Sequence, residues 1–177
     1  MVCPSWLSFI LYNPIRKAFT NREEIFNESG ITKNAVVLEV GPGNGFLTEA
    51  LAEHAQKVYA VELQAGMVRK LMKRVRKFGD RVCIVQGDIS SLILEEAFCD
   101  VCLLYVCFHE FGDKVKAAEN ISRALKKGGI LSIYEPSIEV GKSDMQKTVA
   151  LFEGSGFRKE LERDGFFVRY ARLRKQR

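Results

Sequence analysis

Short apolar runs rich in β-branched residues alternate along this chain with longer segments in which apolar residues recur at helical spacing. The runs predict buried strands at residues 36–40, 58–61, 82–85, 101–106 and 130–134. The longer segments predict helices at residues 46–56, 64–78, 113–125 and 143–153. We expect Ser143 to cap the start of the last helix, and Lys126-Lys127-Gly128-Gly129 to close the helix before it.

Two further strands are predicted at residues 158–163 and 166–173, joined by the hairpin dipeptide Asp164-Gly165. Alternation of strands and helices at this pitch predicts an α/β fold with a parallel sheet, and the hairpin adds an antiparallel pair at one edge. No internal repeat or linker is visible. We therefore expect one domain over residues 31–177, preceded by an N-terminal helical cap or lid over residues 1–30.

Length and composition place the chain among ordinary globular domains. Its 177 residues suit a single domain, and 47% of them are apolar while 28% are charged. This balance excludes a disordered, collagen-like, coiled-coil or membrane-bundle protein. The apolar segment at residues 6–12 is far shorter than the roughly 20 residues that span a bilayer. A helix packed on the domain is its simplest interpretation, and a pocket cover, a dimer contact or a contact with a membrane surface are the alternatives.

The net charge of +5 is concentrated in two blocks. Residues 69–81 hold seven basic residues and one acidic residue, and residues 156–177 hold eight basic and three acidic residues. Such blocks can attract nucleic acid or an acidic substrate. No aromatic interleaving or base-reading motif accompanies them, so a solvated helix face and a basic C-terminus are the simpler interpretation.

The cysteines are Cys3, Cys83, Cys99, Cys102 and Cys107, and the sequence shows no recognisable cleavable signal peptide. Both observations predict a reducing, cytoplasmic location. Cys99 and Cys102 have the spacing of a metal-binding pair, but side chains on a regular strand alternate between faces, so the two thiols are not expected to meet. With two histidines in the chain, we expect no metal site.

A glycine-rich loop at residues 41–45 separates the first predicted strand from the first predicted helix. Its glycines let the backbone turn sharply and approach a ligand closely, and the start of the helix supplies free N–H groups. A dinucleotide fingerprint has glycines at positions one, three and six, whereas this loop has them at one, three and five, with Phe46 at six. A bulky residue there crowds the turn, which weakens an interpretation as an NAD site.

Acidic residues follow the next two predicted strands. Glu62 ends the second strand, 21 residues after Gly41, where a carboxylate can accept hydrogen bonds from both hydroxyls of a ribose. Gly87-Asp88-Ile89 follows the third strand, where Asp88 can bind an adenine amino group. Ligands of open α/β sheets bind beyond the carboxyl ends of the strands. The loop and the two acids together therefore predict a nucleoside ligand.

With these residues the chain resembles the class I S-adenosylmethionine-dependent methyltransferases. The matching motifs are Glu39-x-Gly41-x-Gly43-x-Gly45, Glu62, Gly87-Asp88-Ile89 and Leu125-Lys126-Lys127-Gly128-Gly129. The resemblance implies a Rossmann-like sheet of seven strands in the order 3-2-1-4-5-7-6, mostly parallel, with helices on both faces. It implies that Glu39 and the glycine loop hold the methionine end of the cofactor, Glu62 the ribose, and Asp88 with Ile89 the adenine. The residues that it assigns to the cofactor are Glu39, Gly41, Pro42, Gly43, Asn44, Gly45, Glu62, Leu63, Gly87, Asp88, Ile89 and Tyr105.

Two branches of that family share features with this chain. The segment after the fourth strand, residues 105–111, is similar to the ubiquinone/menaquinone-biosynthesis-like branch of small-molecule methyltransferases. The glycine loop is also similar to that of the ribosomal-RNA adenine dimethyltransferases. Those enzymes carry an Asn-Leu-Pro-Tyr type motif after the fourth strand, and residues 104–108 here contain neither Asn nor Pro. This departure, and the expectation of no appended substrate domain, favour a small-molecule acceptor.

Methyl transfer from a sulfonium is an in-line displacement, so most of the barrier reduction can come from holding donor and acceptor in line. A base is required only where the acceptor must lose a proton. His109 is the candidate base because it titrates near neutrality and follows the fourth strand. Glu110 is a second candidate catalytic residue and Glu135 a candidate polar contact, and a purely structural role is the alternative for each. An RNA or protein methyltransferase and a non-catalytic cofactor-binding protein are the alternative functions.

Overall fold

A seven-stranded sheet forms the centre of the protein, which a computed structural model describes from residue 21 to residue 176. Its strands are β1 (Val36–Val40), β2 (Lys57–Glu62), β3 (Val82–Gln86), β4 (Cys99–Tyr105), β5 (Leu125–Pro136), β6 (Phe157–Asp164) and β7 (Val168–Lys175). Their order in space is β3-β2-β1-β4-β5-β7-β6. Neighbours among β1 to β5 pair in parallel, while β7 is antiparallel to both β5 and β6. The predicted sheet order and mostly parallel arrangement are confirmed.

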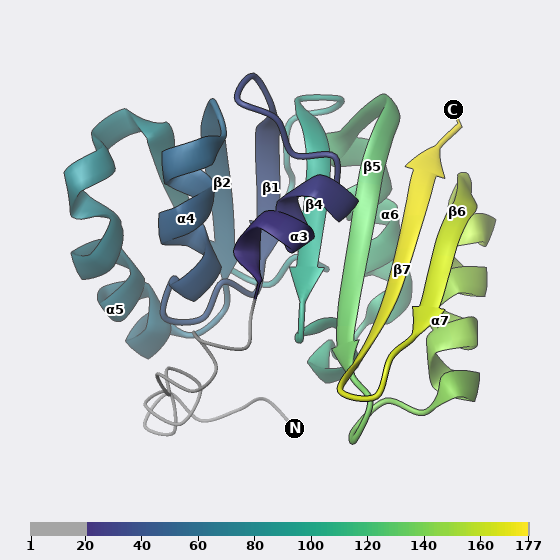
Figure 1. Cartoon of the computed structure of the whole chain (residues 1–177). Helices are drawn as coiled ribbons and strands as arrows, with labels where there is room; N and C mark the ends of the chain where they lie inside the picture. The colour runs from purple at the N-terminus through teal and green to yellow at the C-terminus, as the bar shows by residue number, and fades with distance from the viewer. Residues whose placement is uncertain (1–20, 177) are drawn as a thin grey trace.

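Helices cover both faces of the sheet (Figure 1). They are α3 (Arg22–Glu28), α4 (Phe46–His54), α5 (Ala65–Val75), α6 (Lys114–Ala124) and α7 (Lys142–Gly154), with 3-10 turns η2 (Arg76–Arg81) and η3 (Phe108–Glu110). On β1, Val37 packs in the apolar cluster of α3 and α4, and its neighbour Leu38 packs in the cluster of α6 and α7. Within residues 21–176, no helix has the length and apolar character required to cross a membrane.

The apolar faces of α4 and α5 largely follow the predicted spacing. In α4, Phe46, Leu47 and Leu51 are buried against the sheet. In α5, Leu71 is fully buried, but Met72, which we expected on the same apolar stripe, is 56% exposed. The apolar stripe of α5 is narrower than predicted because this helix lies near the edge of the sheet formed by β3.

Two predicted helix-capping signals are wrong. Leu125 leaves the helix and enters β5, where it pairs with Cys99, so residues 126–129 do not cap α6 but belong to the strand. The N-cap of α7 is Gly141 and not Ser143. The reason is that the Gly141 carbonyl accepts the first two helical hydrogen bonds, from the N–H groups of Asp144 (3.1 Å) and Met145 (3.0 Å).

An irregularity in β4 changes the environment of the cysteines. The pairing register between β4 and β5 shifts between Cys99 and Val101, and Cys99 therefore lies in the same buried cluster as Cys102 and Cys107. The expectation that Cys99 and Cys102 occupy opposite faces is wrong for this reason. Burial raises the pKa of Cys99 to about 12 and that of Cys102 well above its usual range, so these thiols behave as small apolar residues.

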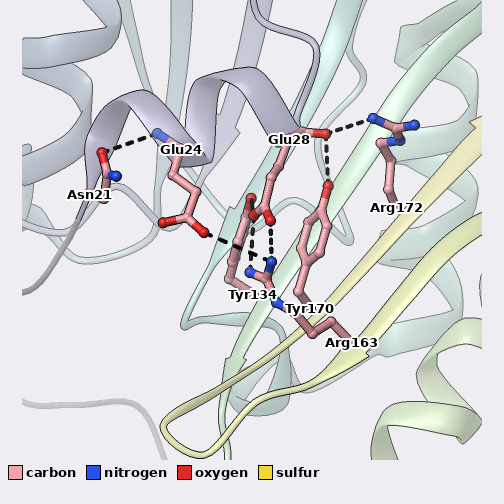
Figure 2. A network of polar contacts seen from close by, with 7 residues as sticks. All are labelled: Asn21, Glu24, Glu28, Tyr134, Arg163, Tyr170 and Arg172. Carbon is pink, nitrogen blue, oxygen red and sulfur yellow. Dashed lines mark hydrogen bonds and ion pairs between the residues drawn. The ribbon is translucent and has the colours of Figure 1, made fainter.

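The carboxyl-terminal residue of α3, Glu28, ties this helix to the sheet (Figure 2). Its carboxylate accepts a hydrogen bond from the Tyr134 hydroxyl (3.0 Å) and pairs with Arg163. Its backbone carbonyl accepts hydrogen bonds from the Tyr170 hydroxyl (2.8 Å) and from Arg172 (3.0 Å). These contacts satisfy polar groups at the end of the helix and hold α3 across β5 and β7.

The predicted N-terminal cap falls partly outside the described residues, which exclude residues 1–20 and with them the apolar segment 6–12. The part that is described, α3, buries Ile25 and Phe26 on the sheet. Arg22 at its start donates to the carbonyl of Phe46 (3.1 Å) and lies over the Phe46 ring, 4.5 Å from its centroid. The start of α3 therefore lies beside the start of α4, next to the glycine loop.

Candidate cofactor and acceptor site

A cavity of about 410 Å³ opens at the carboxyl ends of the parallel strands. It brings together, from four separate chain segments, the predicted site residues Gly41, Gly43, Glu62, Leu63, Gly87, Asp88, Ile89, His109 and Glu110. A smaller hollow of about 80 Å³ is lined by the predicted residues Glu39, Pro42, Asn44 and Tyr105. Gly41 and Gly43 line both spaces, so the glycine loop forms the wall between them.

Each glycine of the loop has its own structural role. Gly41 has φ +71°, and a Cβ on it would lie 2.7 Å from the Cβ of Cys107, so the loop passes close to the segment after β4. Gly43 has φ +58°, and a Cβ on it would meet nothing within 4 Å. Gly45 lines neither space. It is the N-cap of α4, and a Cβ there would lie 2.6 Å from Leu71 of α5.

Glu62 at the end of β2 is bonded to the glycine loop, a contact that the sequence does not reveal. Its side chain is buried, and its Oε2 accepts the N–H of Gly43 at 2.9 Å while Oε1 accepts the N–H of Gln64 at 2.8 Å. Burial raises the pKa of Glu62, and these two hydrogen bonds oppose the shift. The backbone N–H of Leu63 also bonds this carboxylate, and the two oxygens together offer about four acceptor sites, so Glu62 can still accept a hydrogen bond from a ligand hydroxyl in the cavity.

Asp88, after β3, stabilises its own turn as well as lining the cavity. Its Oδ1 accepts hydrogen bonds from the backbone N–H (2.9 Å) and the hydroxyl (2.8 Å) of Ser90. The N–H of Gly87 donates to the carbonyl of Glu62 at 3.0 Å, which brings the end of β3 beside the end of β2. The ends of these two strands therefore present Glu62 and Asp88 to the same cavity.

Glu39 is a buried carboxyl group without a full set of partners. It is 2% exposed, one residue before the end of β1, and its Oε2 has no hydrogen-bond partner. Burial raises its pKa to about 7; the Thr48 hydroxyl opposes this shift and the charge of Glu62 adds to it. A buried acceptor atom beside the hollow under the loop is suited to a cationic or N–H-bearing group of a ligand.

The raised pKa of Glu39 predicts a pH-dependent stability difference between the wild type and Glu39→Gln. The folded state holds the Glu39 proton more tightly than the unfolded state, so wild-type stability falls as the pH rises from the ordinary carboxyl range to about 7. Gln cannot ionise, so the variant should gain on the wild type, by on the order of 1–3 kcal/mol at pH 8 relative to pH 5. Urea unfolding at both pH values measures this difference.

Glu53→Gln is the matched control, because Glu53 lies on the exposed face of α4 and pairs with Lys77 at 3.5 Å. This substitution should leave the difference between the two pH values close to that of the wild type. A Glu39→Gln variant whose stability follows the wild type at both pH values would contradict the buried, partly protonated Glu39.

His109 is held at both ring nitrogens by carboxylates. Its Nδ1 pairs with Glu135 at the end of β5, and its Nε2 lies 3.1 Å from Glu139. The backbone N–H of His109 also donates to Glu135 (3.2 Å), and its carbonyl accepts from Lys114 (3.1 Å). The hydrogen bond to Glu135 raises the pKa of His109, and the charges of both glutamates add to that shift. The sequence identified His109 and Glu135 individually, but no motif marks Glu139 as their partner.

Comparisons with known proteins identify the family of this chain. Residues 38–133, more than half of the chain, match the family described as a methyltransferase domain. An uncharacterized methyltransferase of Geobacillus sp. (strain WCH70) is 36% identical over 115 residues, which cover 64% of this chain and 53% of that protein. A ribosomal RNA small subunit methyltransferase of Arabidopsis thaliana is 38% identical over 96 residues, covering 53% of this chain and 25% of that protein.

A solved structure has nearly the same extent as this chain. The crystal structure of an S-adenosylmethionine-dependent methyltransferase from Aquifex aeolicus has a TM-score of 0.86 at 22% identity, over 98% of this chain and 99% of that one. The chain belongs to the methyltransferase-domain family, and its fold is that of the class I S-adenosylmethionine-dependent methyltransferases. It spans about half the length of the Geobacillus relative and a quarter of the Arabidopsis one.

Proposed function

We propose that this protein transfers a methyl group from S-adenosylmethionine to a small-molecule acceptor. The observation that carries the proposal is the cavity at the strand ends, which unites the glycine loop, Glu62, Asp88 and His109. Family membership supports methyl transfer as the reaction. The small-molecule acceptor is proposed in addition to the family assignment. A relationship to the ubiquinone/menaquinone-biosynthesis-like branch is proposed in the same way.

The residues at the site fit S-adenosylmethionine. Glu39 offers an unpartnered carboxyl oxygen to the methionine end, Gly43 leaves open space where a side chain would stand, and Glu62 keeps lone pairs for the ribose hydroxyls. Asp88 and Ile89 lie on the same cavity wall for the adenine. When bound, the cofactor supplies a methyl group activated by a sulfonium. The protein's part is to hold that methyl in line with the acceptor and to exclude water.

His109 and Glu110 are the residues proposed to act on the acceptor. Both line the cavity, and they come from the turn η3, which begins three residues after the end of β4. Glu110 can hold the acceptor by a hydrogen bond, and His109 can take a proton from it. Substituting His109 by Ala is expected to lower turnover and to spare cofactor affinity.

Charge supports a small acceptor over RNA. The residues that line the cavity include the four carboxylates of Glu62, Asp88, Glu110 and Glu139, which repel phosphate groups. Cations of the basic C-terminal block, residues 156–177, form ion pairs and hydrogen bonds within the protein instead.

In that block, Arg174 pairs with Glu160, and Lys175 donates to the carbonyls of Ser122 (2.5 Å) and Leu125 (2.7 Å). RNA methylation is the second candidate, favoured by the similarity to the Arabidopsis ribosomal RNA methyltransferase.

Calorimetric titration with S-adenosylmethionine, S-adenosylhomocysteine and NADH tests the proposal. We expect micromolar binding of both adenosyl ligands and none of NADH, because the loop departs from the dinucleotide spacing. A folded, ligand-free protein that binds neither adenosyl compound would overturn the cofactor. Tight binding of a short RNA that weakens steeply with salt would favour the second candidate.

We also propose a reducing, cytoplasmic location. Among residues 21–176, the cysteines Cys83, Cys99, Cys102 and Cys107 are all free thiols.

A further inference from the structure

A second cavity lies next to the cofactor cavity and shares two of its wall residues. It has a volume of about 330 Å³ and extends between η3, the end of β5 and α7. His109 and Glu139 line both cavities, and Nε2 of His109 lies 3.1 Å from Oε2 of Glu139. The contact between these two side chains is therefore the partition between the two spaces.

The two carboxylates on His109 differ in how firmly they are held. The Glu135 side chain is 2% exposed, and it accepts both the Nδ1 proton and the backbone N–H of His109. The Glu139 side chain is 60% exposed and lies in the segment between β5 and α7. An exposed carboxylate is solvated readily and is held weakly by one ion pair, whereas a buried carboxylate cannot leave its partner without a large cost. Of the two contacts, the one at Nε2 is therefore the one that can open.

The other charged groups around His109 do not change this difference between Glu135 and Glu139. Glu110 precedes α6 on the same turn as His109, and its charge favours the protonated ring. Lys114 of α6 is bound to the His109 carbonyl at 3.1 Å. Across the second cavity, on α7, Asp144 pairs with Lys147 at 2.8 Å. The cations are thus engaged with partners other than the imidazole ring.

We infer that Glu135 and His109 form a proton-accepting pair for the methyl acceptor, and that Glu139 is a removable cover on Nε2. An acceptor with an ionisable O–H or N–H group enters from the second cavity and takes the place of Glu139 against that nitrogen. This inference rests on the proposed function for its reaction, while the pair and its cover are defined by the side chains of this chain alone. Glu135 is a positioning residue, since it fixes the ring and its tautomer from behind.

The proton balance defines the role of each group. The acceptor atom forms its bond to the methyl carbon with its own electron pair, and the pair of the breaking methyl–sulfur bond stays on sulfur. The proton of the acceptor O–H or N–H goes to Nε2 of His109, and Glu135 stabilises the resulting imidazolium. Nε2 can accept that proton only in the neutral ring, so the proton that Nε2 shares with Glu139 must first leave to solvent with the displaced carboxylate. Removal of the Glu139 charge from beside the ring favours this loss.

NMR titration of the histidine rings tests the inference without cofactor or acceptor. The chain has two histidines, so a His54→Gln variant assigns the spectrum. We expect the titration midpoint of His109 to move to lower pH in Glu139→Gln and further in Glu135→Gln. Each change removes a negatively charged carboxylate from beside the ring. In Glu139→Gln, nitrogen shifts should place the proton of the neutral ring on Nδ1, which leaves Nε2 open.

Asp144→Asn is the matched control, because it removes a carboxylate from the second cavity that does not contact the ring. It should leave the His109 midpoint unchanged. A midpoint that does not move in Glu139→Gln, or a neutral ring protonated at Nε2, would overturn the inference. If Glu135→Gln does not fold, the Glu139→Gln titration still decides it. Failure of cofactor binding in calorimetry would instead count against the proposed function.

Discussion

Replacing Glu62 by Ala is expected to weaken S-adenosylmethionine binding by roughly a hundredfold. The change removes a buried carboxylate that is proposed to bind the ribose, and two charge-assisted hydrogen bonds are together worth about 3 kcal/mol. It also releases the N–H groups of Gly43 and Gln64, which Glu62 now binds at 2.9 and 2.8 Å. The glycine loop therefore loses one of its hydrogen bonds to β2, while the bond from the Gly41 N–H to the Val61 carbonyl (2.9 Å) remains. Calorimetric titration of the variant with S-adenosylmethionine measures the loss.

A matched control is Glu53→Ala, which removes a carboxylate from the exposed face of α4 without touching the cavity. It should bind the cofactor like the wild type. The free energy of unfolding of Glu62→Ala should also fall, by about 1–3 kcal/mol, because two backbone donors lose their partner. Unaltered affinity in the folded Glu62→Ala variant would refute the ribose role.

Replacing Gly41 by Ala is expected to cost about 3 kcal/mol or more of folding stability. Ala resists the left-handed backbone at φ +71°, which costs about 1–2 kcal/mol. Its Cβ would also lie 2.7 Å from the Cβ of Cys107, an atom fixed to the backbone of the segment after β4. For a domain of this size the melting temperature should fall by roughly 6–12 °C, as measured by calorimetry or circular dichroism.

Gly43→Ala separates backbone strain from steric contact. Gly43 has φ +58°, but a Cβ there meets nothing within 4 Å, so only the strain of about 1–2 kcal/mol remains. The added methyl group should instead occupy the space proposed for the cofactor and lower its affinity at least tenfold. Equal loss of stability in the two variants would show that contact with Cys107 does not set the path of the loop.

The sequence was sufficient to predict the sheet and most of its helices. The β-branched run Val36–Val40 and the apolar stripe of α4 could be recognised because the local spacing of apolar residues shows which positions are buried. The ends of elements depended on longer-range pairing. Leu125 joins β5 and not a helix cap because Cys99 offers it a strand partner, and Cys99 changes sides because the register shifts after it.

The positions of the candidate cofactor residues could be predicted because parallel strands place their carboxyl ends at one edge, so residues after β1, β2, β3 and β4 meet there. The contacts among them could not be predicted in the same way. The hydrogen bond from Gly43 to Glu62 joins residues 19 positions apart, and nothing local to either residue requires it. The same holds for Gly41, whose φ suits a turn but whose closeness to Cys107 depends on how β4 ends.

By itself, the sequence determined the class of fold and predicted the edge at which a nucleoside would bind, because periodicity and strand-end motifs encode these features locally. The order of the strands followed from the resemblance to the class I S-adenosylmethionine-dependent methyltransferases. Only the tertiary structure decided which carboxylates surround the His109 ring. Glu135 reaches it from β5, 26 residues away, and Glu139 from the segment beyond β5. The charge of an imidazole depends on which carboxylates lie within a few ångströms of it, and the packing of distant segments sets those distances.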